Sequence, residues 1–130
     1  MAETDSSRSK VRSIKAFVPA RDFEQSRRFY LELGFRELWG DGSACGLEID
    51  GQGFILQMFY VKEHAGNFMM SLNVENADQW WEHIAALKLK EKYPLSMLKP
   101  PEMQPWGIRV LYMADPTGVL WHIAEAPKGS

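Results

Sequence analysis

One histidine stands in the middle of a short apolar run in the stretch DPTGVLWHIAEAP, residues 115–127. An imidazole placed like that of His122 can ligate a metal, act as a general base, contact a bound ligand or occupy a structural position beside a partner. Gln57 ends an earlier stretch, DGQGFILQ. Its amide can donate and accept hydrogen bonds, to a ligand or to a neighbour such as His122. The residue types leave these alternatives open.

Other reactive side chains are weaker candidates for catalysis. Strand side chains alternate between faces, so Glu125 lies on the opposite face from His122, and a solvated or interface role is favoured for it. Cys45 is the single cysteine. It has neither a basic neighbour in sequence nor a helix start to activate it, which favours a packed strand residue. We therefore predict no catalytic residue.

The elements that position these residues begin with a predicted strand over residues 14–20. Asp22, with Gln25 three residues later, predicts a helix start, and Gly34 predicts its end. The apolar stripe of this helix is formed by Ser26, Phe29, Tyr30 and Leu33. Three short strands are expected within residues 35–40, 43–51 and 53–61, separated by the turn signals GDGS and DGQG.

The same order returns from residue 67 onward. A strand FMMSLNV precedes a second helix, whose cap Asn76 matches Asp22 with a shift of 54 positions. A shift of 65 positions superposes Gln57 on His122 and aligns the D-x-x-G turns that precede them. The extra residues fall in PLSMLKPPEMQPWG, residues 94–107, whose prolines predict a loop. The sequence thus predicts a doubled βαβββ unit.

Composition indicates one compact domain without targeting signals. The chain has 130 residues, 45% of them hydrophobic, and a formal charge of -2. It has neither a basic surplus for nucleic acid nor an apolar run long enough for a membrane, so a cytoplasmic protein is expected. We expect a disordered tail over residues 1–11 and a domain over residues 12–127, with modules at about 12–62 and 67–127.

Two motifs resemble those of the vicinal oxygen chelate superfamily, which includes glyoxalase I, bleomycin resistance proteins and extradiol dioxygenases. They are RRFYLELGF at residues 27–35 and DPTGVLWHIAE at residues 115–125. The resemblance implies an α+β fold in which two tandem βαβββ modules form a curved mixed sheet around a cleft, with the helices outside. It also implies a homodimer.

The resemblance places four possible metal ligands on strands that face the cleft, here Lys15, Gln57, Met69 and His122. A hard divalent cation prefers imidazole and carboxylate donors, whereas an ammonium repels it and a thioether is too soft. Only His122 is a good donor. We therefore predict that the protein uses no metal and no cofactor, as in the bleomycin resistance type.

Strand alternation predicts which side chains accompany Gln57 and His122 in the cleft. Ile55, Phe59, Leu120 and Ala124 are expected beside them. The opposite face, toward the helices, is expected to carry Phe54, Leu56, Met58, Val119, Trp121 and Ile123. Such a cleft is mostly apolar, as small-molecule pockets usually are. The predicted ligand-binding residues are Trp39, Gln57, Phe59, Trp106, Tyr112 and His122, with Trp106 over the pocket mouth.

These features favour a metal-independent protein that binds a small aromatic or planar organic ligand, with drug or antibiotic sequestration as the function. We expect a homodimer that binds neither nucleic acid nor membrane. The alternative is a metal-dependent enzyme of the same superfamily, a lyase, an isomerase or a ring-cleaving dioxygenase. A further alternative is a degenerate module that serves protein interaction.

Overall fold

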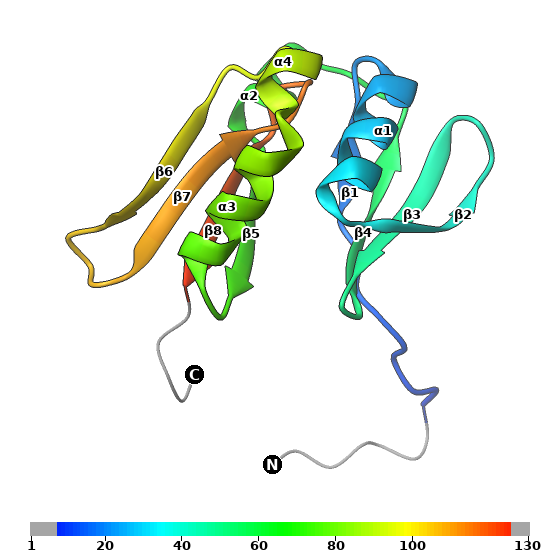
Figure 1. Cartoon of the computed structure of the whole chain (residues 1–130). Helices are drawn as coiled ribbons and strands as arrows, with labels where there is room; N and C mark the ends of the chain where they lie inside the picture. The colour runs from blue at the N-terminus through cyan, green and yellow to red at the C-terminus, as the bar shows by residue number, and fades with distance from the viewer. Residues whose placement is uncertain (1–7, 126–130) are drawn as a thin grey trace.

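The computed structural model describes residues 8–125 and consists of two modules with the same order of elements (Figure 1). The first module contains β1 (Phe17–Pro19), α1 (Phe23–Leu33), β2 (Arg36–Gly40), β3 (Ala44–Ile49) and β4 (Gln52–Gln57). The second follows a short helix α2 (Lys62–Asn67) and contains β5 (Met69–Val74), α3 (Ala77–Leu87), α4 (Leu89–Lys92), β6 (Leu98–Met103), β7 (Arg109–Ala114) and β8 (Leu120–Glu125).

Each module forms its own four-stranded mixed sheet. The strand orders are β1-β4-β3-β2 and β5-β8-β7-β6, and in each sheet only the first pair is parallel. The α+β class and the tandem βαβββ repeat predicted from the sequence are confirmed. The two sheets remain separate and are not closed around a common cleft within one chain.

Both long helices begin where their side-chain caps predict. The Asp22 carboxylate accepts a hydrogen bond from the Gln25 backbone N–H at 3.1 Å, and the Asn76 amide oxygen accepts one from the Gln79 N–H at 3.0 Å. At the end of α1, Gly34 adopts φ +132°, a conformation that side chains disfavour. Local chemistry therefore fixes the bounds of these helices.

A single aromatic core joins the two modules. Tyr30 packs against Phe54 with ring centroids 5.0 Å apart, and Phe54 packs against Trp121 of the second sheet at 5.6 Å. The helix-facing sides of both sheets contribute to this core, and α1 and α3 lie over the same side of the molecule (Figure 1). The opposite side of each sheet, called here its open face, is left outside the shared core.

A buried hydrogen-bond network fastens the D-x-x-G turn before β8 to α1. Asp115 Oδ1 accepts hydrogen bonds from the backbone N–H groups of Thr117, Gly118 and Val119 at 2.9–3.0 Å. The Tyr30 hydroxyl donates to Asp115 Oδ2 at 2.5 Å. Burial raises the pKa of Asp115, and burial together with this carboxylate raises the pKa of Tyr30 well above its usual range. The turn is therefore a structural link between the modules.

The prediction of a loop over residues 94–107 is wrong for its central part, which forms β6. This strand pairs with β7 only, so it lies at the sheet edge, where proline is tolerated because one row of N–H groups needs no partner. The pairing register shifts between Lys99 and Glu102, and Pro100 and Pro101 occupy this irregularity.

The expected orientation of Met58 and the expected bounds of the first strand are also corrected. Met58 does not face the helices, because β4 ends at Gln57, and its side chain is 59% exposed. The first strand covers Phe17–Pro19 only.

Of the expected tail, residues 8–11 are exposed and outside any element, and residues 1–7 lie outside the described part, as do residues 126 and 127. Within residues 8–125, no helix is long and apolar enough to cross a membrane.

Cys45 is a packed strand residue with an unreactive thiol. Its side chain is buried, and burial raises its pKa to about 11. Because the thiolate is the reactive form, we expect iodoacetamide at pH 8 to label the native protein about 100-fold more slowly than the urea-unfolded protein. Mass spectrometry measures the rate directly at this single cysteine. Equal rates in the two states would mean that β3 opens readily.

Candidate ligand-binding site

The open face of the first sheet follows from strand alternation. Cys45, Leu47, Phe54 and Leu56 are buried in the shared core. The residues that alternate with them along β3 and β4 must therefore point to the opposite face. These are Ala44, Gly46, Glu48, Gly53, Ile55 and Gln57. The face combines small, apolar and amide side chains with the Glu48 carboxylate.

An apolar row crosses this face from edge to edge. Phe17 pairs with Ile55, Ile55 with Gly46, and Gly46 with Trp39. A Cβ atom added to Gly46 would collide with Trp39 Nε1, so the indole rests directly on the glycine backbone. Trp39 is 47% exposed and Phe17 is 51% exposed. The row is therefore an aromatic platform, defined by Phe17, Ile55, Gly46 and Trp39.

Polar groups flank this aromatic platform on both sides. Gln57 lies half-buried next to Ile55 along the same face. On the other side, Lys15 Nζ lies 3.2 Å from a Cβ built on Gly53, so the Lys15 side chain does cover this face. Glu48 pairs with Arg36 at 3.0 Å and not with Lys15. A ligand on the platform would meet an amide at one end and a cation at the other.

The open face of the second sheet carries His122 in the register row Ser71, His122, Tyr112 and Lys99. The His122 and Tyr112 rings meet edge to face with centroids 4.9 Å apart. His122 Nε2 is covered and has no hydrogen-bond partner among the described residues. An unpaired buried polar atom costs about 1–3 kcal/mol, so a ligand group that bonds to this nitrogen would recover that cost. Glu125 has a structural role, because its carboxylate accepts a hydrogen bond from Ala77 N–H at the start of α3.

The six predicted ligand-binding residues do not meet within one chain. Trp39 and Gln57 lie on the first open face, whereas Tyr112 and His122 lie on the second. Within one chain, no hydrogen bond therefore joins Gln57 to His122. Phe59 is exposed in the segment after β4, and Trp106 is exposed in the turn between β6 and β7.

Phe17 and Gly46 contribute to the aromatic platform although the sequence pattern does not single them out. Phe17 belongs to a strand of three residues, too short for a periodic signal. Gly46 contributes by lacking a side chain, which matters only once its cross-strand neighbour is known to be Trp39. The alternation of Ile55 with Phe54 and Leu56 predicts its place on this face, and that place is confirmed.

The strand register corrects one of the four positions that the family resemblance implies for metal ligands. Phe17 pairs with Ile55 and Met69 pairs with Leu120, so Phe17 and not Lys15 is the counterpart of Met69. The four positions then carry a phenyl, an amide, a thioether and one imidazole, a donor set that does not fit a hard divalent cation. Within residues 8–125, no three His, Cys, Asp or Glu side chains are grouped to hold a metal ion.

Comparison with known proteins agrees with this architecture. The sequence profile of the Glyoxalase/Bleomycin resistance protein/Dioxygenase superfamily matches residues 13–123. The chain belongs to this superfamily. The resemblance predicted from the two sequence motifs is thereby confirmed, and the match covers both modules of the superfamily fold.

Individual relatives within the superfamily differ in what they do. A bleomycin resistance protein from Klebsiella pneumoniae is 25% identical over 115 residues, which are 83% of this chain and 87% of the relative. A bleomycin-binding protein solved with bleomycin has a TM-score of 0.76 at 20% identity, over 90% of this chain and all of that one. A lactoylglutathione lyase from Agrobacterium tumefaciens has a TM-score of 0.64 at 14% identity, over 89% and 94% of the two chains.

Proposed function

We propose that this protein binds a planar organic compound without a metal and sequesters it, as a bleomycin-resistance-like protein. The observation that carries the proposal is the exposed aromatic platform, where the Trp39 indole lies against Gly46 in a row with Ile55 and Phe17. A flat ring system can stack on such a surface and bury a large apolar area. Sequestration needs no nucleophile, in keeping with the donor-poor strand positions described above.

A second copy of the chain would complete the binding cleft. The two open faces lie outside the shared core of one chain, and each leaves large apolar side chains exposed, such as Phe17 on one and Met69 on the other. In a symmetric dimer the first open face of one protomer opposes the second open face of its partner, twice. Trp39 and Gln57 would then line the same cleft as Tyr112 and His122 of the other protomer.

Binding is tested by titrating the protein with bleomycin and with planar aromatic compounds while tryptophan fluorescence is recorded. We expect saturable quenching at micromolar ligand. Trp39→Ala should weaken binding about tenfold or more, because a central aromatic contact is lost. Gly46→Ala should do nearly the same, because the new methyl group displaces the indole. His122→Ala should also weaken binding, since it removes the unpaired nitrogen.

Leu38→Ala is the matched control, because Leu38 is an exposed neighbour of Trp39 that lies at the irregularity of β2 and has no partner in the register row of the aromatic platform. It should leave affinity unchanged. Absence of quenching at tens of micromolar for every compound would overturn the binding proposal. Unchanged affinity in Trp39→Ala and His122→Ala would overturn the site.

The alternative is an enzyme of the same superfamily, and two observations favour considering it. One solved structure with this fold is a lactoylglutathione lyase, and His122 offers one imidazole at a family ligand position. Metal analysis of the purified protein separates the two functions. Our proposal expects no stoichiometric divalent ion, whereas about one tightly held ion per chain would favour the enzyme.

A further inference from the structure

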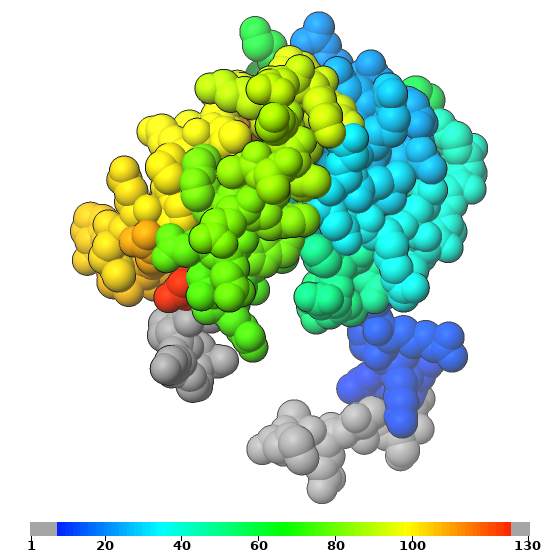
Figure 2. Space-filling model, viewed as in Figure 1, coloured from blue at the N-terminus to red at the C-terminus, as the bar shows by residue number. Residues whose placement is uncertain are grey.

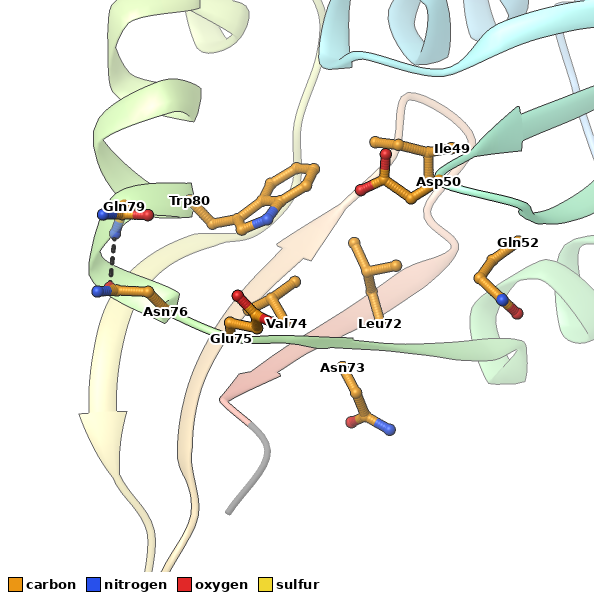
Figure 3. A pocket seen from close by; sticks show the side chains of 10 residues that line it. All are labelled: Ile49, Asp50, Gln52, Leu72, Asn73, Val74, Glu75, Asn76, Gln79 and Trp80. Atoms are coloured by element: carbon orange, nitrogen blue, oxygen red, sulfur yellow. Dashed lines mark hydrogen bonds between the residues drawn. The ribbon is translucent and has the colours of Figure 1, made fainter. Parts of the chain in front are cut away.

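A groove separates the two modules on the helix side of β5, away from both open faces. It lies between the β3–β4 turn of the first module and the end of β5 with the start of α3, where the space-filling view is hollowed (Figure 2). Its volume is about 400 Å³. It is lined by Ile49, Asp50, Gln52, Leu72, Asn73, Val74, Glu75, Asn76, Gln79 and Trp80 (Figure 3).

The lining has a distinct chemistry. The Trp80 indole extends into the groove from α3, and the Asp50 carboxylate points toward it from the opposite module (Figure 3). Glu75 lies beneath the indole on the β5 side. Leu72 and Val74 supply an apolar floor. No lysine or arginine is among the lining residues that the structure describes, so the groove joins an aromatic face to two carboxylates without a compensating cation.

The two carboxylates of the groove lack ion-pair partners among the described residues, whereas the start of α3 already has hydrogen-bond partners. Neither Asp50 nor Glu75 forms an ion pair with another residue between positions 8 and 125. The positive end of α3 is already occupied, because Asn76 accepts from Gln79 N–H and Glu125 accepts from Ala77 N–H. An anion would therefore meet two carboxylates and few free donors. A cation would meet the two carboxylates, while the positive end of α3 is partly offset by the Asn76 and Glu125 oxygens that already accept its N–H groups.

We propose that this groove binds a small organic cation, an alkylammonium group whose charge lies between Trp80, Asp50 and Glu75. An ammonium over a tryptophan face is attracted by the ring quadrupole, and nearby carboxylates add Coulombic attraction. The apolar floor of Leu72 and Val74 accepts the alkyl substituents. The site is separate from the aromatic platform and does not depend on the proposed function.

Choline and its uncharged carbon isostere, 3,3-dimethylbutan-1-ol, form a matched pair of probes. They share shape, so only the charge differs between them. Isothermal titration calorimetry should detect saturable choline binding with a Kd of about millimolar, and at least roughly tenfold weaker binding of the alcohol. Added salt should weaken choline binding and leave that of the alcohol unchanged.

Three variants test the three groups. Asp50→Asn keeps the turn, because asparagine tolerates the φ of +49° found at Asp50, and removes only the charge. Asp50→Asn, Glu75→Gln and Trp80→Leu should each weaken choline binding roughly fivefold, the loss expected for one such contact. Glu91→Gln, an exposed carboxylate on α4, and Trp39→Leu, on the open face, are the matched controls and should bind choline normally.

The outcomes distinguish choline binding in the groove from binding elsewhere on the protein. Equal binding of choline and the alcohol would overturn the cation proposal, as would no saturation up to about 50 mM, where even a weak cation–π site fills appreciably. Loss of binding in Trp39→Leu with retention in Trp80→Leu would assign the cation to the open face and also overturn it. The bleomycin titration tests the aromatic platform, which is a different site. A negative result with choline would therefore leave the proposed function unaffected.

Discussion

Replacing Asp115 with alanine is expected to lower the free energy of unfolding by about 3–5 kcal/mol, because it leaves several buried donors without an acceptor. Asp115 Oδ1 serves three backbone N–H groups, and Oδ2 serves the Tyr30 hydroxyl. The Tyr30 oxygen in turn accepts a hydrogen bond from Trp121 Nε1 at 2.9 Å. One substitution therefore disrupts the β8 turn, α1 and the aromatic core together.

Urea unfolding followed by circular dichroism measures this loss. Asp115→Asn is the informative control, because its amide oxygen can still serve the three backbone N–H groups and its volume is the same. We expect it to cost about 1–2 kcal/mol, well below alanine. Tyr30→Phe should lower the free energy of unfolding by about as much as Asp115→Asn does, since it leaves Trp121 Nε1 and one carboxylate oxygen unpaired. An alanine variant as stable as the wild type would mean that the D-x-x-G turn does not hold the modules together.

Local signals made much of the fold predictable. Asp22 and Asn76 determine helix starts through bonds to residues three positions ahead, so sequence spacing contains the whole interaction. The repeat of the D-x-x-G turn before Gln57 and before His122 revealed the tandem modules, and the structure places both residues at corresponding positions of the two sheets.

Features that depend on partners distant in sequence were not predictable. The prolines of β6 indicate a loop until β6 is known to be an edge strand, where their missing N–H groups matter little. The shift of 54 positions that superposes the two helices also matches Met69 with Lys15. The strand pairing matches Met69 with Phe17 instead, because the spacing between strand and helix differs by two residues between the modules. The relation of Trp39 to Gly46 depends on the β2–β3 register, which shifts near Leu38.

Phe17→Glu is expected to break the proposed homodimer. Phe17 is half exposed on the first open face, in the row with Ile55, so a carboxylate there stays solvated in the monomer and is buried without a partner in the dimer. Burying an unpaired charge at an interface costs several kcal/mol, which predicts a dimer dissociation constant raised about 100-fold or more. Ligand affinity should fall with it, because each cleft needs both protomers.

Sedimentation equilibrium of the wild type and the variant measures the dissociation constant, and circular dichroism shows whether the fold survives. Leu38→Glu is the control, because it places the same charge on an exposed β2 side chain that is not paired in the register row of Phe17, Ile55, Gly46 and Trp39. It should remain dimeric. A wild type that is monomeric at about 100 μM, a concentration at which specific homodimers with apolar interfaces are formed, would contradict the dimer. Tight ligand binding by such a monomer would then show that one open face is a complete site.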